Sequence, residues 1–140
     1  MKQLLFFAVI ATALYASACK KTDDTVDYQY HAHINAPTAD DKHVGDTMHI
    51  HVDFESHSME TIHHVNIRIY NKADLTEVYN MPTEAHVHAT SGSYAFHDDF
   101  ILSNANGVTA HTDWVLEAKV WGHEDGLQEE TATVEFHVHP

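Results

Sequence analysis

The chain has 140 residues, a formal net charge of −14 with histidine counted as neutral, one cysteine and fifteen histidines. Such acidity argues against nucleic acid and anionic lipid surfaces as partners, and it favours cations. The length suits a single domain with a core of its own and leaves no room for a second domain of ordinary size.

The first segment in chain order has the pattern of a secretory signal peptide. Lys2 precedes an apolar run over residues 4–15, and the small residues 16–18 then lead to Cys19. The apolar run is short for a membrane span, and a site of small residues is typical of signal cleavage. We therefore predict a signal peptide over residues 1–18.

The small residues followed by the chain's cysteine resemble the lipobox of bacterial lipoproteins. In that family the chain is cut just before the cysteine, and lipid is attached to the sulfur. The resemblance implies cleavage between Ala18 and Cys19, acylation of Cys19 and a lipid anchor in the outer membrane. Ala16 departs from the family pattern, which usually has a larger aliphatic residue there. Ordinary cleavage near Ala18, with a free thiol at Cys19, is the alternative.

Residues 19–27 are polar and charged, and we expect them to form a flexible tether between lipid and domain. The acidic residues Asp23 and Asp24 are similar to the surface-export signals of some bacterial lipoproteins, which implies exposure on the cell surface. With Cys19 acylated, no thiol remains for a disulfide or for a cysteine-ligated zinc site. Any bound metal must then use histidine and carboxylate ligands.

Residues 28–140 alternate between apolar and polar positions in short runs that are separated by turn-forming residues. Period-two alternation with strong β-formers predicts half-buried strands, and no run shows a helical stripe. The expected strands cover residues 28–34, 48–54, 64–70, 85–89, 94–101, 114–120 and 131–139. We predict an all-β domain, a single immunoglobulin-like antiparallel β-sandwich of about seven strands. An eight-stranded barrel is the alternative fold.

The strand segments together resemble the immunoglobulin-like lipoprotein domains of bacterial cell envelopes, in particular a histidine-containing family of uncharacterised function. The segments that carry the resemblance are residues 45–54, 65–70, 114–120 and 133–139. The resemblance implies a fold and a cellular address, but it implies no activity.

Histidines that stand two residues apart are the strongest functional signal of the chain. The four pairs are His31 and His33, His49 and His51, His86 and His88, and His137 and His139. Alternate side chains of a strand point the same way, so each pair presents both imidazoles on one face. Neutral imidazole is the commonest protein ligand for transition metals. We therefore predict binding of a divalent metal ion, zinc first and copper(II) second.

The same alternation assigns the histidines to faces of the two sheets. With Met48 to Phe54 buried at every second position, His49, His51 and Asp53 face outward. His31 and His33 face outward from the first expected strand. The first and second strands of a sandwich are often neighbours, so four imidazoles are expected on one outer face. Imidazoles on paired strands are close enough to share a metal ion. The other sheet is expected to present His64, Glu117, Glu135, His137 and His139. The additional candidate ligands are Asp53, His64, His97, Asp99 and Glu135.

The predicted function is metal buffering or handling at the cell envelope, without catalysis. The chain has no H-E-x-x-H or G-x-S-x-G motif and no phosphate-binding glycine loop. One alternative is an adhesion or assembly module that binds a protein or glycan, with the histidines as polar surface. Another is a pH-responsive module, because protonation of all fifteen histidines changes the charge from −14 to +1.

Overall fold

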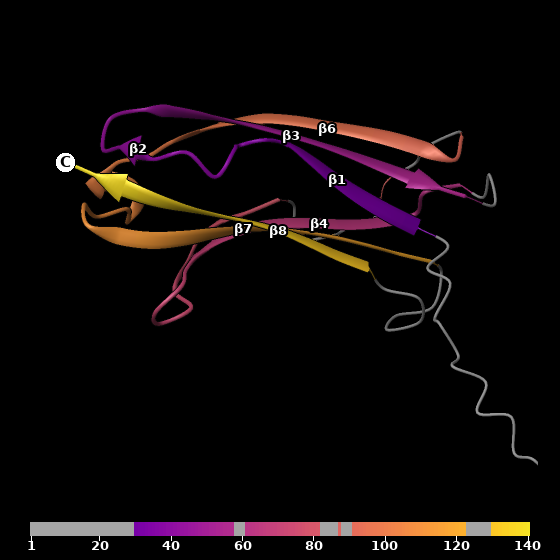
Figure 1. Ribbon diagram of the computed structural model, residues 1–140. Coiled ribbons are helices and arrows are strands. Elements are labelled where there is room, and N and C mark those ends of the chain that lie inside the picture. The colour runs from indigo at the N-terminus through magenta and orange to yellow at the C-terminus, as the bar shows by residue number, and fades with distance from the viewer. Residues whose placement is uncertain (1–29, 58–60, 82–86, 88–90, 123–129) are drawn as a thin grey trace, which may run out of the picture.

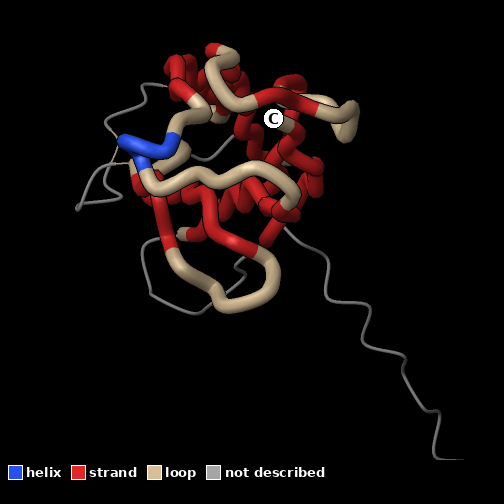
Figure 2. The backbone as a smooth tube through the Cα atoms, turned by 90° about the vertical axis from the view of Figure 1, so that its left-hand side faces the viewer, coloured by secondary structure: helices blue, strands red, loops and turns tan. Residues whose placement is uncertain are grey.

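The computed structural model describes residues 30–57, 61–81, 87, 91–122 and 130–140. Two sheets lie face to face and form a sandwich (Figure 1), which Figure 2 shows from the side. The elements are β1 (Tyr30–Ala36), β2 (Lys42–His43), β3 (Thr47–Ser56), β4 (His64–Asn71), β5 (Glu77–Asn80), β6 (Ser93–Ile101), the 3₁₀ turn Asn104–Asn106, β7 (Thr112–Trp121) and β8 (Glu130–His139). Among the described residues, no helix has the length and apolar character that crossing a membrane requires.

The three-stranded sheet has the order β1-β3-β6, and the five-stranded sheet has the order β2-β8-β7-β4-β5. All pairs are antiparallel except β2, which runs parallel to the end of β8. Two separate sheets confirm the predicted β-sandwich and rule out the single closed barrel. The first long strands, β1 and β3, are neighbours, as the sequence predicted.

Alternate residues of the central strands form the core between the sheets. Val52 of β3, Ile67 of β4 and Leu116 of β7 are fully buried, and Trp114 is 2% exposed. Each such side chain contributes about 1.5–3 kcal/mol when it is removed from water. The Trp114 indole donates a hydrogen bond of 2.7 Å to Oγ1 of Thr112, which satisfies its buried N–H group. The inward positions predicted from the alternation of β3 and β7 are therefore confirmed.

Two strands were not predicted, because β2 and β5 are too short to show a periodic pattern. Of the expected strand over residues 85–89, only the buried Val87 is described, and its N–H donates to the carbonyl of His63. The signal peptide over residues 1–18, the tether over residues 19–27 and Cys19 all lie outside the described residues.

The outer face of the five-stranded sheet is partly covered by its own long side chains. Glu117 points to this face as predicted, yet it is only 7% exposed. Nε of Arg68, from the neighbouring strand, donates a hydrogen bond of 2.7 Å to Glu117, which raises the pKa of Arg68. The Arg68 guanidinium also lies over the ring of Tyr70, at 4.7 Å from its centroid. Glu117 therefore points outward, as predicted, but it is covered by Arg68 and serves as a buried ion-pair partner.

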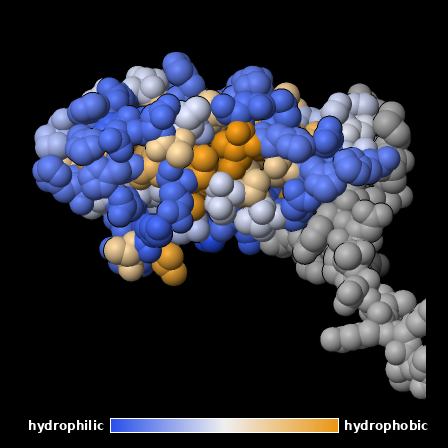
Figure 3. Space-filling view, in the orientation of Figure 1, coloured by the Kyte–Doolittle hydropathy of each residue, from blue (hydrophilic) through white to orange (hydrophobic). Residues whose placement is uncertain are grey.

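The rest of the surface is mostly polar. On the face shown in Figure 3, hydrophilic residues surround a small apolar area near the middle of the sandwich. Among the described residues, the large hydrophobic side chains classed as exposed are Leu75 and Ile101.

Candidate metal centre

Three imidazoles meet at the end of the five-stranded sheet where β8 finishes. They belong to His111, His137 and His139, and one ring nitrogen from each lies within 4.8 Å of the others. Among the described residues, no other set of three histidine, cysteine or carboxylate side chains satisfies this distance. We call His111, His137 and His139 the candidate metal centre.

The alternation of side chains along β8 places two of the three imidazoles in the candidate metal centre. His137 and His139 are two residues apart on β8, so both point to the outer face, and their ring centroids are 4.7 Å apart. The intervening Val138 and the preceding Phe136 are buried in the core and hold this part of the strand in place. The predicted outward placement of this histidine pair is therefore confirmed, and the pair contributes to the candidate metal centre.

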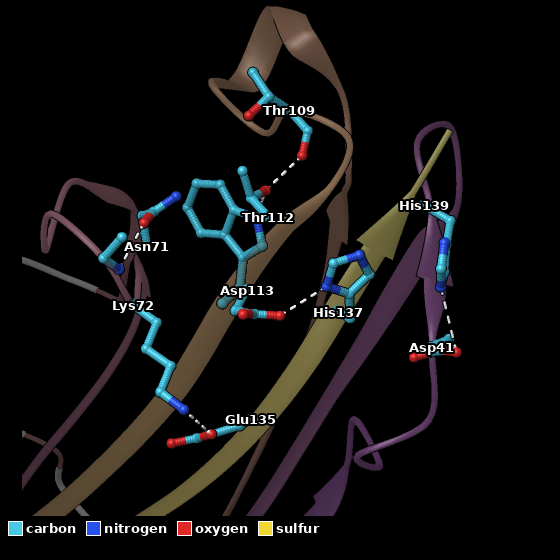
Figure 4. Close-up of polar contacts among 11 residues, drawn as sticks. Asp41, Asn71, Lys72, Thr109, Thr112, Asp113, Glu135, His137 and His139 are labelled. Atoms are coloured by element: carbon cyan, nitrogen blue, oxygen red, sulfur yellow. Dashed lines mark hydrogen bonds and ion pairs between the residues drawn. The ribbon is translucent and has the colours of Figure 1, made fainter.

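Each of these two imidazoles is also paired with a carboxylate (Figure 4). Nδ1 of His137 donates to Oδ1 of Asp113 at 2.7 Å, and Nε2 of His139 lies 3.3 Å from Oδ2 of Asp41. A carboxylate acceptor fixes the tautomer of an imidazole and raises the basicity of its other nitrogen. The arrangement leaves Nε2 of His137 and Nδ1 of His139 as the nitrogens with a lone pair for a metal ion.

His111 reaches the centre from the connection between the 3₁₀ turn and β7. Its backbone is in the left-handed region, with φ of 59°, and its N–H donates a 2.7 Å bond to the carbonyl of Val138. A residue with a Cβ adopts this conformation at some cost, although histidine tolerates it better than most. The hydrogen bond to Val138 thus holds His111 beside β8. Sequence reasoning missed His111, because it belongs to no histidine pair and no strand.

The surroundings of the candidate metal centre are open and polar. His43 of β2 lies opposite His139 in the parallel ladder, and their ring centroids are 5.7 Å apart. Beside His111 is a surface hollow of about 540 Å³, lined by residues 71–74, Thr109 and residues 111–113. Solvent therefore has direct access to the imidazole of His111.

The outer face of the three-stranded sheet carries the other described histidine pairs where the alternation placed them. The register, however, puts His31 opposite Glu55 and His33 opposite Asp53, and a bulge between Ile34 and Ala36 shifts the rest. Each β1 imidazole therefore faces a carboxylate on β3 instead of a second imidazole. Strand alternation alone could not specify this register.

The histidines of β3 and β6 also contact carboxylates or stack on one another. Nδ1 of His49 donates to Oδ1 of Asp99 at 2.5 Å, and His51 stacks on His97 with centroids 4.1 Å apart. Nε2 of His51 donates to Oδ1 of Asp53 at 3.2 Å. These side chains are neighbours, as predicted, yet they do not bring three ligand atoms within 4.8 Å of one another.

The remaining candidate ligands have structural partners. Nδ1 of His64 donates to the carbonyl of Gly122 at 2.8 Å, and its ring stacks on Trp121. Glu135 accepts a 2.5 Å hydrogen bond from Lys72, which raises the pKa of that lysine. His86 and His88 lie outside the described residues.

Comparison with known proteins identifies the fold. No protein-family model matches the chain, and no curated protein sequence matches it. The solution structure of the CARDB domain of PF1109 from Pyrococcus furiosus is similar, with a TM-score of 0.53 and 14% identity over 79% of this chain and 94% of that one. The crystal structure of that domain in complex with di-metal ions gives a TM-score of 0.50 and 12% identity over 78% of this chain and 86% of that one. The chain thus has the immunoglobulin-like sandwich fold of these domains.

Proposed function

We propose that this domain binds a divalent transition-metal ion at the candidate metal centre, zinc first and copper(II) second. The observation that carries the proposal is the convergence of one nitrogen each from His111, His137 and His139 within 4.8 Å. Zinc binds imidazole nitrogens at about 2.0–2.1 Å, so tetrahedral ligands lie about 3.4 Å apart. Metal binding at this spacing requires side-chain rotations that bring together three donors now up to 4.8 Å apart.

The donor set favours zinc and copper(II) over calcium and magnesium. Imidazole nitrogen suits zinc and copper, whereas calcium and magnesium take oxygen ligands. Asp113 and Asp41 each hold an imidazole through its other nitrogen, as the partners of metal-bound histidines commonly do. Three protein ligands also leave a fourth tetrahedral position for water or an exchanging ligand.

The exposure of the ligands supports metal buffering or handling without catalysis as the role. The side chains of His137 and His139 are 33% and 40% exposed, so an ion held there remains in contact with solvent. An exposed ion exchanges readily with competing ligands and is not enclosed with a substrate. The crystal structure of the CARDB domain of PF1109 with di-metal ions supports the idea that an immunoglobulin-like domain of this shape can carry metal.

The proposed place of action is the bacterial envelope, with the chain anchored to the outer membrane through lipid on Cys19. This part of the proposal rests on the signal-peptide pattern of residues 1–18 and the small residues before Cys19. Intact mass spectrometry of the protein from bacterial membranes tests it. A chain that begins at Cys19 and carries acyl groups supports the anchor, and an unmodified thiol at Cys19 refutes it.

The metal-binding proposal is tested on the full chain, purified in mild detergent without chelator. Metal content is measured by inductively coupled plasma mass spectrometry, and affinity by calorimetric titration with zinc and copper(II). We expect the combined variant His111→Gln, His137→Gln and His139→Gln to lose one ion per chain. The matched control replaces three histidines of the other sheet, His49, His51 and His97, with glutamine and keeps that ion. Equal metal content in both variants contradicts the proposal.

A further inference from the structure

A second group of imidazoles surrounds one carboxylate at the opposite end of the sandwich. Glu55 stands near the end of β3, His31 and His33 begin β1, and His57 follows β3 directly. Nε2 of His33 lies 2.9 Å from Oε1 of Glu55, and Nε2 of His57 lies 3.9 Å from the same oxygen. Two ring nitrogens therefore converge on a single carboxylate oxygen.

The three ligand atoms are not all within 4.8 Å of one another, so an ion bound here requires the exposed His57 side chain to rotate toward Glu55 and His33. Zinc–nitrogen and zinc–oxygen bonds of about 2.0–2.2 Å place neighbouring ligand atoms about 3.4 Å apart. The third imidazole is close by, because the ring centroid of His31 lies 4.2 Å from that of His57 and 6.3 Å from that of His33. Three histidines and one glutamate thus supply four donors of the types that zinc uses.

His31 is oriented by a carboxylate from the other sheet. Its Nδ1 lies 2.6 Å from Oε2 of Glu130, the first residue of β8, and that side chain also accepts a bond of 3.4 Å from the backbone N–H of Ala32. The contact leaves Nε2 of His31 as the nitrogen with a lone pair. The pairing has the same form as that of Asp113 with His137 in the candidate metal centre.

Glu55 is the carboxylate that His33 and His57 both approach. Its pKa is lowered mainly by the hydrogen bond from His33, with further contributions from the charges of His33, His57 and His31. A single imidazole is enough to pair with an exposed carboxylate. Here His33 and His57 both lie near Glu55, and His31 lies beside His57. We propose that His31, His33, His57 and Glu55 form a second site for a divalent transition-metal ion, with the Glu55 carboxylate as a direct ligand.

The two sites are independent of each other. Glu130 begins β8 and His139 ends it, and the nine steps between these ten residues span roughly 30 Å of extended strand. No side chain is shared, so one site can fail without affecting the other. The second site therefore does not rest on the candidate metal centre.

The test measures zinc stoichiometry by calorimetry and cobalt(II) absorption on the full chain, in wild type and in three variants. We expect Glu55→Gln combined with His57→Gln to lower bound zinc by one ion per chain and to remove part of the visible cobalt absorption. Glu55 and His57 are 49% and 64% exposed, so the substitutions do not disturb the core. The matched control is Glu135→Gln, an exposed carboxylate paired with Lys72, and it keeps the wild-type stoichiometry.

The outcomes separate the two proposals. A loss of one ion in the Glu55 and His57 variant supports the second site, whether or not the combined His111, His137 and His139 variant loses one. Unchanged zinc binding and cobalt absorption in the Glu55 and His57 variant overturn the second site. In that case a loss confined to the combined His111, His137 and His139 variant leaves the candidate metal centre standing alone.

Discussion

Asp113 and His137 are direct cross-strand partners on β7 and β8, and the Asp113 carboxylate accepts a hydrogen bond of 2.7 Å from Nδ1 of His137. His49 and Asp99 make the same kind of cross-strand pair on β3 and β6 at 2.5 Å. The two pairs differ in their surroundings, since His137 has the nitrogens of His111 and His139 within 4.8 Å. They therefore provide a matched comparison of a ligand-orienting pair and an ordinary surface pair.

The first prediction concerns Asp113→Asn. An asparagine lacks the negative charge that raises the basicity of the other His137 nitrogen, so zinc affinity is expected to fall about 10- to 100-fold. Asp99→Asn changes the equivalent pair on the other sheet and should leave this affinity unchanged. Calorimetric titration of both variants with zinc gives the comparison. An equal effect of both substitutions would show that Asp113 has no special role.

The second prediction concerns the backbone of His111. Glycine adopts positive φ without steric cost, so His111→Gly is expected to raise the metal-free unfolding free energy by about 0.5–1 kcal/mol while it weakens zinc binding. Leu75 also has positive φ, at 63°, and Leu75→Gly is the control. That control should give a similar gain in urea denaturation with no change in zinc affinity. A large loss of stability in His111→Gly would contradict this account.

The third prediction is a dependence of metal binding on pH. Protons compete with the metal for imidazole nitrogen, so zinc affinity should fall steeply from about pH 7.5 to about pH 5.5. Titrations at several pH values, with the protein shown to stay folded by circular dichroism, measure this dependence. Constant affinity over this interval would exclude imidazole as the ligand.

The fourth prediction concerns the covered ion pair between Arg68 and Glu117. Removal of Arg68 leaves the Glu117 carboxylate buried and short of its closest partner, so Arg68→Ala should lower the unfolding free energy by about 1–3 kcal/mol. Lys72→Ala breaks the exposed pair with Glu135 and should lower the unfolding free energy much less, because solvent screens that pair. Urea denaturation of both variants tests the difference. Similar losses would mean that the burial of Glu117 is unimportant.

The fifth prediction follows from the lowered pKa of Glu55. A carboxylate whose folded pKa lies below its unfolded value of 4.5 stabilises the fold above that pH, and the contribution disappears as pH falls through the folded pKa. In metal-free protein, Glu55→Gln should therefore be less stable than wild type near pH 6, and the gap should close in acid. Denaturation at several pH values measures the gap. A gap that grows in acid would contradict the assignment.

Much of the fold follows from strand alternation. The buried positions of β3 and the inward Trp114 of β7 were predictable because half-buried strands repeat every second residue. The short strands β2 and β5 were not, since two and four residues carry no periodic signal. Glu117 shows a further limit of alternation, because it predicts which face a side chain takes but not whether a neighbour such as Arg68 covers it.

The candidate metal centre was only partly predictable. His137 and His139 stand out as a pair on a strand, and Asp113 could have been found by pairing the last two strands as a hairpin. His111 depends on a left-handed backbone that no local pattern indicates. The contact between His31 and Glu130 joins residues of different sheets, 99 positions apart. Such contacts depend on register and on sheet packing, which the alternation of single strands does not fix.

Strand β8 runs from one end of the sandwich to the other. Glu130, at the start of this strand, touches His31 near the beginning of β1, whereas His139 lies at the far end of the sandwich. In the proposed lipid-anchored form, the chain would enter the domain at the His31 end, and the long axis of the sandwich would point away from the bilayer. The candidate metal centre would then face the surrounding medium, and the histidines around Glu55 would lie nearer the lipid headgroups.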